Sequence, residues 1–154
     1  GHSAADQENA TRPLFQFRGH KTEGYAMDWS RCDKGALATG DCNGQVFVYH
    51  PTESGWSVVT TPFVGHRASV EDIQWSPSES TVFATCSVDR TIKIWDTRSK
   101  GHKSMLSVTA HASDVNVISW NRQVGYLLVS GSDDGTFRVW DFRNNLWGRG
   151  SSET

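Results

Sequence analysis

The sequence predicts an all-β fold of three consecutive four-stranded blades, because one pattern occurs three times along the chain. Each copy opens with a small residue and a histidine, at Gly19-His20, Gly65-His66 and Ala110-His111, and closes at Tyr49-His50, Trp95-Asp96 and Trp140-Asp141. In every copy the histidine precedes the closing aromatic residue by 29 positions (20 to 49, 66 to 95, 111 to 140). A repeat of roughly 40–45 residues indicates one four-stranded unit per copy, stacked against its neighbours.

Local chemistry predicts the strands of each blade in order. We expect strands at 26–30, 36–40, 46–50 and 56–60, then at 70–76, 82–87, 91–96 and 105–108, and last at 115–121, 127–132 and 136–141. Alternation in Ile92-Lys93-Ile94-Trp95 and in Phe137-Arg138-Val139-Trp140 favours strands that bury one face. Asn43-Gly44 and Asp134-Gly135 favour tight hairpin turns, in which glycine accepts positive φ.

The two ends of the chain do not match. We expect a disordered polar tail at 1–12, the outer strand of a preceding blade at 13–19 (Leu14 to Phe17), repeats at 20–64, 65–109 and 110–144, and a tail at 145–154. Blade three lacks an outer strand, apart from a trace near Leu146-Trp147. The chain is therefore predicted to be an open part of a larger ring. One hypothesis is strand exchange, in which the first strand pairs with blade three of another copy and two copies form six blades. The alternative is a fragment with exposed, aggregation-prone edges.

A set of four polar and aromatic residues has the same spacing in the second and third repeats. The sets are His66, Thr85, Asp89 and Trp95, and His111, Ser130, Asp134 and Trp140. A hydrolase would use Ser, His and Asp once, in a cleft. A set in each blade instead predicts a structural chain of hydrogen bonds that satisfies buried polar groups. In the first repeat the set is His20, Thr39, Asn43 and Tyr49, so the charge-assisted bond to histidine is expected to be lost.

Composition excludes several classes of function. The net charge of −2 indicates no global attraction to nucleic acid, and the basic stretch Arg98, Lys100, His102 and Lys103 lacks interleaved aromatic residues, which favours a solvated loop. No apolar run reaches the ~20 residues of a membrane span. No two of the three cysteines have CxxC spacing, and the sequence contains no phosphate-binding loop or dinucleotide fingerprint. We therefore expect no metal, no cofactor and no enzymatic activity.

The Gly-His openings and Trp-Asp closings resemble the WD40 repeat, which implies a β-propeller. Three further stretches, Glu23-Gly24-Tyr25, Ser69 to Asp72 and Asp114-Val115-Asn116, resemble the histone-binding group, the retinoblastoma-binding type. Within that group, Phe63 to His66, Thr39 to Cys42 and Val115 to Trp120 are similar to the glutamate-rich WD-repeat ribosome-assembly chaperones. The resemblance implies a non-enzymatic scaffold, in the nucleus or nucleolus, for a basic client, either a ribosomal protein or a histone.

Two sets of surface residues follow from these resemblances. In the histone-binding relatives, residues just after each Gly-His contact a basic protein at one mouth of the propeller, and the matching positions are Glu23, Tyr25, Glu71, Asp114 and Asn116. Carboxylates pair with Lys or Arg, and a Tyr ring accepts a cation. Asp72 is expected to point to the other face of its strand and to be structural. Alternatively, Arg98 and Arg143 follow Trp-Asp as in substrate receptors of a cullin-based ubiquitin ligase, where the Arg contacts the adaptor.

Overall fold

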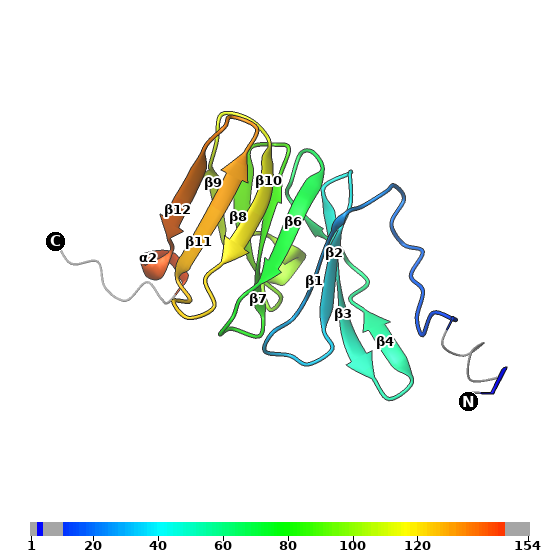
Figure 1. The fold of residues 1–154 in the computed structure, drawn as a ribbon. Helices are drawn as coiled ribbons and strands as arrows, with labels where there is room; N and C mark the ends of the chain where they lie inside the picture. The colour runs from blue at the N-terminus through cyan, green and yellow to red at the C-terminus, as the bar shows by residue number, and fades with distance from the viewer. Residues whose placement is uncertain (1–2, 5–10, 147–154) are drawn as a thin grey trace.

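Three antiparallel sheets stand side by side in chain order in the computed structural model, which describes residues 3–4 and 11–146 (Figure 1). Blade one comprises β1 (Ala26–Trp29), β2 (Leu37–Gly40), β3 (Gln45–Thr52), β4 (Gly55–Val58) and the short β5 (Phe63–Val64). Blade two comprises β6 (Val70–Trp75), β7 (Val82–Ser87), β8 (Thr91–Asp96) and β9 (Leu106–Thr109). Blade three comprises β10 (Val115–Trp120), β11 (Leu127–Ser132) and β12 (Phe137–Asp141). The predicted all-β, blade-like fold is confirmed.

The outer strand of blade one is split into two pieces, which the sequence did not predict. The long β3 pairs with β4 along its second half, from Tyr49 to Thr52, and with β5 at its start, where Gln45 faces Val64. Pro62 immediately precedes β5 and carries no N–H group to donate to a ladder. The β5 piece therefore ties the linker between blades one and two to the edge of blade one.

The two chain ends differ from expectation. The segment Leu14 to Phe17, predicted as a strand, is irregular, because a strand needs a neighbour to pair with and the described residues offer it none. At the other end, the expected trace of an outer strand is replaced by the short helix α2 (Arg143–Leu146), and Trp147 lies outside the described residues. Most of the expected tails at 1–12 and 145–154 also lies outside them.

Apolar side chains fill the two spaces between the blades. Between blades one and two, Val46 and Val48 belong to a cluster with Ile73, Phe83 and Trp95, and each of these side chains is at most 1% exposed. A similar cluster joins blades two and three. Burying one such side chain contributes about 1.5–3 kcal/mol, so these inter-blade clusters are the main source of stability.

Hydrogen bonds between the inner strands add a second link from blade to blade. Trp75 donates its backbone N–H to the Asp28 carboxylate at 2.8 Å and its indole N–H to the Asp28 carbonyl at 3.0 Å. Asp72 accepts the backbone N–H of Ile118 in the same way, at 3.0 Å. Burial raises the pKa of both carboxyl groups. Asp72 therefore faces the neighbouring blade and holds two blades together.

Candidate functional site

A chain of hydrogen bonds runs through blade two and is repeated in blade three. In blade two, Trp95 donates its indole N–H to the Thr85 hydroxyl at 2.8 Å, and His66 Nε2 lies 2.5 Å from the same hydroxyl. His66 Nδ1 lies 2.9 Å from Asp89 Oδ2. A neutral imidazole satisfies all three contacts, because Nδ1–H donates to the carboxylate and Nε2 accepts the hydroxyl proton.

Blade three repeats these contacts with its own set of residues. Trp140 donates to the Ser130 hydroxyl at 2.9 Å, His111 Nε2 lies 2.7 Å from that hydroxyl, and His111 Nδ1 lies 3.0 Å from Asp134 Oδ2. Ser130 and His111 are almost fully buried. Ser130 is buried and bonded to both Trp140 and His111, so its hydroxyl is not available as a nucleophile. These contacts hold in place the loop that begins the third repeat.

The electrostatics of the blade-two chain favour a neutral histidine and an ionised aspartate. Burial lowers the pKa of His66, against the opposing effect of Asp89. Burial also acts to raise the pKa of Asp89, but hydrogen bonds from His66, Thr91 and the backbone N–H of Arg67 outweigh it and hold this pKa well below its usual range. The pair is therefore a carboxylate bound by N–H and O–H donors, with each hydrogen bond to the charged group contributing about 1.5–3 kcal/mol.

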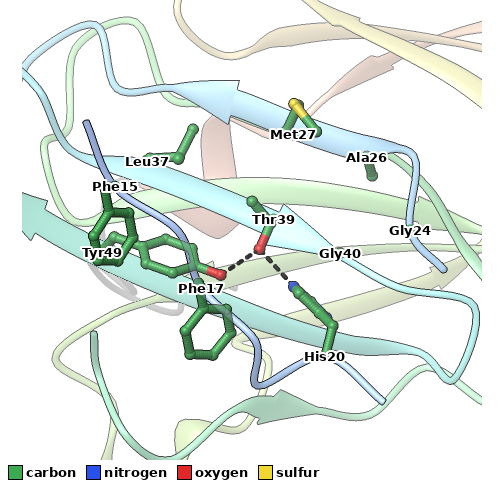
Figure 2. A pocket seen from close by; sticks show the side chains of 10 residues that line it. All are labelled: Phe15, Phe17, His20, Gly24, Ala26, Met27, Leu37, Thr39, Gly40 and Tyr49. Atoms are coloured by element: carbon green, nitrogen blue, oxygen red, sulfur yellow. Dashed lines mark hydrogen bonds between the residues drawn. The ribbon is translucent and has the colours of Figure 1, made fainter. Parts of the chain in front are cut away.

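Blade one keeps the carboxylate that the sequence pattern indicated was lost. The exposed Asn43 does not take the place of Asp89; instead Asp41, two residues earlier and fully buried, lies 2.7 Å from His20 Nδ1. His20 Nε2 lies 2.7 Å from the Thr39 hydroxyl, which lies 2.7 Å from the Tyr49 hydroxyl (Figure 2). The expectation of a lost charge-assisted bond is therefore wrong, because the carboxylate enters from a different position of the same turn.

Asp41 makes the hydrogen bonds that a serine and an aspartate make separately in blade two. In blade two, Ser87 accepts the backbone N–H of Asp89 at 3.0 Å, and Asp89 then accepts from the histidine. In blade one, Asp41 stands at the position of Ser87, and its Oδ1 accepts the backbone N–H groups of Asn43 and Gln45 at 2.9 and 3.0 Å. Its Oδ2 is left for His20. Sequence spacing alone missed this exchange.

The candidate mouth residues lie at the same end of the three inner strands. Tyr25, Glu71 and Asn116 each stand five positions after the histidine of their repeat. Tyr25 directly precedes β1, and the other two are the second residues of β6 and β10. These strands are neighbours, as the bonds from β1 to β6 and from β6 to β10 show. Tyr25 and Asn116 are exposed and Glu71 is partly exposed. The structure therefore places the three residues on one rim.

A β-bulge directs two of these side chains. In blade two, Val70 pairs with Ser87 and Asp72 with Cys86, so Glu71 is an extra residue with no partner in the ladder. In blade three, Asn116 is extra in the same way, between Val115 and Val117. A bulge re-aims a side chain and interrupts the alternation of the strand. The bulge is thus the local feature that separates Glu71 from the structural Asp72.

The other two candidate mouth residues, Glu23 and Asp114, stand two positions before Tyr25 and Asn116. Glu23 is exposed and Asp114 is partly exposed. Their carbonyl groups accept the backbone N–H of Cys42 and of Asp133, at 2.8 and 3.1 Å. These bonds fix the loop backbone and leave both carboxylates at the rim.

Asp133 is a rim residue that the sequence reasoning missed. Its exposed carboxylate accepts a hydrogen bond from the Asn116 amide at 2.6 Å. Its neighbour Asp134 points the other way and binds His111 inside the blade. The sequence feature that could have indicated this residue is the adjacent pair Asp133-Asp134 in the third hairpin turn. With Glu23, Glu71 and Asp114, Asp133 brings to four the acidic side chains among the described residues that lie at this end and do not bind a histidine.

The two candidate adaptor-binding arginines lie at the opposite end of the blades. Arg98 and Arg143 follow β8 and β12, which run away from the mouth. Arg98 Nη2 lies 2.7 Å from Asp96 Oδ2, and Arg143 Nη2 lies 2.9 Å from Asp141 Oδ2. The Arg143 guanidinium also lies 4.3 Å from the centre of the Tyr126 ring. Each arginine therefore closes the turn after its own Trp-Asp pair while its side chain stays 72% or 60% exposed.

The basic loop after β8 packs on the linker that precedes blade two. It contains the short helix η1 (Lys100–His102), and the His102 ring stacks on Phe63 of β5 at 4.0 Å between centroids. His102 Nδ1 lies 2.8 Å from the Thr61 carbonyl oxygen. One of the four residues considered for nucleic acid is thus engaged inside the protein.

Two other kinds of site are absent from the described part of the chain. No helix in residues 3–4 and 11–146 is both long and apolar enough to cross a membrane. Over those residues, no three His, Cys, Asp or Glu side chains are grouped so as to hold a metal ion.

Comparison with known proteins agrees with this architecture. The family described as "WD domain, G-beta repeat" matches residues 56–96 and 102–141, together more than half of the chain. These stretches include Trp95-Asp96 and Trp140-Asp141 but not Tyr49-His50, where the repeat departs from the pattern.

Three curated relatives are similar to part of this chain. The chain is similar to "Glutamate-rich WD repeat-containing protein 1" of Dictyostelium discoideum, with 59% identity over 88 residues, covering 57% of this chain and 18% of the relative. It is 48% identical over 99 residues to "Ribosome assembly protein rrb1" of Schizosaccharomyces pombe, covering 64% and 20%. It is 53% identical over 86 residues to "Protein HEAT STRESS TOLERANT DWD 1" of Arabidopsis thaliana, covering 56% and 18%. The matches span about a fifth of these relatives' length, and the chain belongs to the WD40 repeat family.

Proposed function

We propose that this protein is a non-enzymatic WD40 scaffold that binds a basic client during ribosome assembly, in the nucleus or nucleolus. The observation that carries the proposal is the acidic rim, where Glu23, Glu71, Asp114 and Asp133 lie at one end of three adjacent inner strands. A relative named as a ribosome assembly protein supports the assignment to that process. The client is a ribosomal protein or a histone, since both present many Lys and Arg side chains.

The chemistry of the rim suits a cationic peptide segment. Carboxylates at a mouth accept charge-assisted hydrogen bonds from Lys and Arg, and complementary charge raises the rate of encounter. Tyr25, whose side chain is 70% exposed at the same end, offers a flat ring for a guanidinium or ammonium group. The bound segment is therefore expected to carry several Lys or Arg side chains.

The test compares binding of a basic ribosomal protein and of a histone H3–H4 pair, each at two salt concentrations. The paired variant Glu23→Lys/Glu71→Lys reverses two charges at the rim. It is expected to weaken binding about tenfold or more, which corresponds to about 1.4 kcal/mol. Binding of the unaltered protein is expected to weaken as salt rises, because exposed charges are screened.

A matched control changes the same number of charges at the other end of the blades. Glu53, in the turn between β3 and β4, and Glu79, in the loop between β6 and β7, both lie at that end. Glu53→Lys/Glu79→Lys should leave client affinity almost unchanged. Equal losses in the two paired variants would show that only net charge matters and would remove the rim as a site.

A second candidate function uses the opposite end. Arg98 and Arg143 are both ion-paired at their base and both exposed, so two guanidinium groups are presented at one end of the molecule. This observation favours a role as substrate receptor of a cullin-based ubiquitin ligase, with the two arginines contacting the adaptor. Arg98→Ala combined with Arg143→Ala should abolish co-purification of the adaptor; retained co-purification would exclude this role.

A further inference from the structure

A polar hollow of about 370 Å³ lies on the surface of the middle blade. Arg67, in the segment between β5 and β6, contributes to its lining, as do Thr91 and Lys93 of β8 and Ser107 and Thr109 of β9. None of the four acidic rim residues lines it. The hollow is therefore a feature of blade two that is separate from the rim.

Two cationic side chains share this hollow without a carboxylate partner. Lys93 Nζ donates to the Ser107 hydroxyl at 2.8 Å, and its other N–H groups are left free. A Cβ added at Gly65 would lie 3.7 Å from both Cδ and Cε of Lys93, so the lysine stem packs along this glycine. Within residues 3–4 and 11–146, neither Lys93 nor Arg67 forms an ion pair. The ammonium group is thus held in place with donors still available.

The carboxylate that also lines the hollow is already engaged. Asp89 Oδ2 binds His66 and accepts the backbone N–H of Arg67. Asp89 Oδ1 accepts the backbone N–H and the hydroxyl of Thr91, at 2.9 and 2.6 Å. Since two cations line the hollow beside this one carboxylate, the hollow keeps a net positive charge.

An equivalent hollow in blade one has different chemistry. Its lining includes the five residues at the repeat positions of Gly65, Arg67, Thr91, Lys93 and Ser107, which are Gly19, Lys21, Gln45, Phe47 and Pro62. An aromatic ring thus stands where blade two has the ammonium group, and a proline stands where it has a hydroxyl. The repeat forms the hollow, and the residues of each blade decide its charge.

Blade three also lacks the pair of cations. Ala112 stands at the repeat position of Arg67. Arg138, at the position of Lys93, donates to the Ala110 carbonyl at 2.8 Å, so its guanidinium is bonded to the backbone. Blades one and three therefore fold without two cations at these positions, and the fold does not explain the pair in blade two.

We propose that the hollow of blade two binds a phosphate monoester, carried by a phosphorylated serine or threonine of a partner protein. Such a group has a charge of about −1.5 to −2 and strong acceptor oxygens. A guanidinium such as that of Arg67 donates two parallel N–H bonds to phosphate, and the ammonium of Lys93 adds a charge at a fixed place. The exposed hydroxyls of Ser107 and Thr109 supply further donors.

A nucleic-acid backbone fits this hollow less well. Its phosphates carry one charge each and follow one another along the strand, so binding uses a row of cations. The basic residues Arg98, Lys100 and Lys103 follow the other end of β8, beyond Asp96, and do not line the hollow. A single compact charged group on a side chain is therefore the better match.

Binding of phosphorylated peptides to the full-length protein tests the proposal. The probe is an immobilised library of random peptides with one fixed phosphoserine, beside the same library with serine. The phosphorylated library is expected to retain the protein, and the serine library is expected to retain about tenfold less or lower still, because the charge-assisted bonds are lost. Inorganic phosphate is expected to compete only weakly, since it lacks the peptide.

Three variants place the binding in the hollow. Lys93→Met keeps the side-chain stem, removes the charge and should weaken retention about tenfold or more. Ser107→Asp puts a carboxylate beside the Lys93 ammonium and should abolish retention. Lys103→Met is the matched control, because it removes the same charge from an exposed lysine beyond the other end of β8, and it should retain the protein fully. Unchanged circular dichroism shows that each variant is folded.

Four results would overturn the proposal. Equal retention by the two libraries would show that phosphate is not recognised, and equal losses in Lys93→Met and Lys103→Met would show only general charge attraction. Competition by inorganic phosphate as strong as that of a phosphopeptide would indicate a free anion. A single-stranded RNA oligomer that binds more tightly than the phosphopeptides, and is lost in Lys93→Met, would assign the hollow to nucleic acid. Lys93→Met should leave binding of a basic client at the rim unchanged, so this test is independent of the proposed function.

Discussion

Exchanging the residues at positions 41 and 43 tests the hydrogen-bond chain of blade one. Asp41 accepts from His20 and from the backbone N–H groups of Asn43 and Gln45, while the Asn43 side chain is exposed. In Asp41→Ser the hydroxyl can still accept from the backbone of Asn43, as Ser87 does for Asp89. The bonds to His20 and to Gln45 are lost.

The size of the effect follows from those two bonds. Both bonds are accepted by the Asp41 carboxylate, and a hydrogen bond to a charged group contributes about 1.5–3 kcal/mol. Asp41→Ser should therefore lower the free energy of unfolding by about 3–6 kcal/mol. Asn43→Ala removes only an exposed side chain and should change stability by no more than about 0.5 kcal/mol.

The double substitution rebuilds the arrangement of blade two inside blade one. In Asp41→Ser/Asn43→Asp, the new carboxylate at position 43 stands where Asp89 stands and can accept from His20 and Gln45. We expect it to recover most of the loss, to within about 1 kcal/mol of the unaltered protein. Urea denaturation followed by tryptophan fluorescence measures all four proteins. The reasoning fails if Asp41→Ser is neutral, or if the double variant is no more stable than Asp41→Ser alone.

Three further predictions concern pH and packing. Burial raises the pKa of Asp72, so the stability that its protonated form contributes is lost as pH rises from about 4. Asp72→Asn can still accept from Ile118. In urea titrations at several pH values, its free energy of unfolding should therefore rise relative to that of the unaltered protein over that range. Burial lowers the pKa of His66 below 6.5, so the unfolded chain takes up its proton first and stability should fall below about pH 6.5, by at most about 1.4 kcal/mol per pH unit. His66→Gln should lack this slope, and an unchanged slope would contradict the neutral histidine. Trp95→Phe should cost about 1–2 kcal/mol more than Trp140→Phe in thermal or urea unfolding, because Trp95 is fully buried and leaves a larger cavity; equal costs would contradict the role given to burial.

Fixed spacing predicted most of the fold. Strands such as β7 and β8 end where expected, because alternation and turn residues are properties of a few neighbouring residues. The strand expected from Leu14 to Phe17 failed, since a strand also depends on a partner that the local sequence does not contain. The same reason explains β5, which forms because the free start of β3 lies beside it.

The candidate site shows the same division. Position counting placed Glu71 and Asn116 correctly near the start of their inner strands, because the repeat fixes where each inner strand begins. It missed Asp41 as the partner of His20, since a carboxylate two residues away in a tight turn reaches the same point in space. It also missed Asp133, whose role depends on the neighbouring Asn116 side chain across the hairpin.

The bulges at Glu71 and Asn116 separate a position that is free to vary from the packed and paired positions that must stay constant. On an ordinary strand, every substitution alters one of two packed or paired faces, and an insertion reverses all the side chains beyond it. The extra residue in each bulge belongs to neither face, and the same repeat position in blade one carries Tyr25. An aromatic ring, an acid and an amide thus occupy equivalent places in otherwise similar blades. A propeller built in this way can acquire a new partner through one substitution per blade while its inter-blade core remains unchanged.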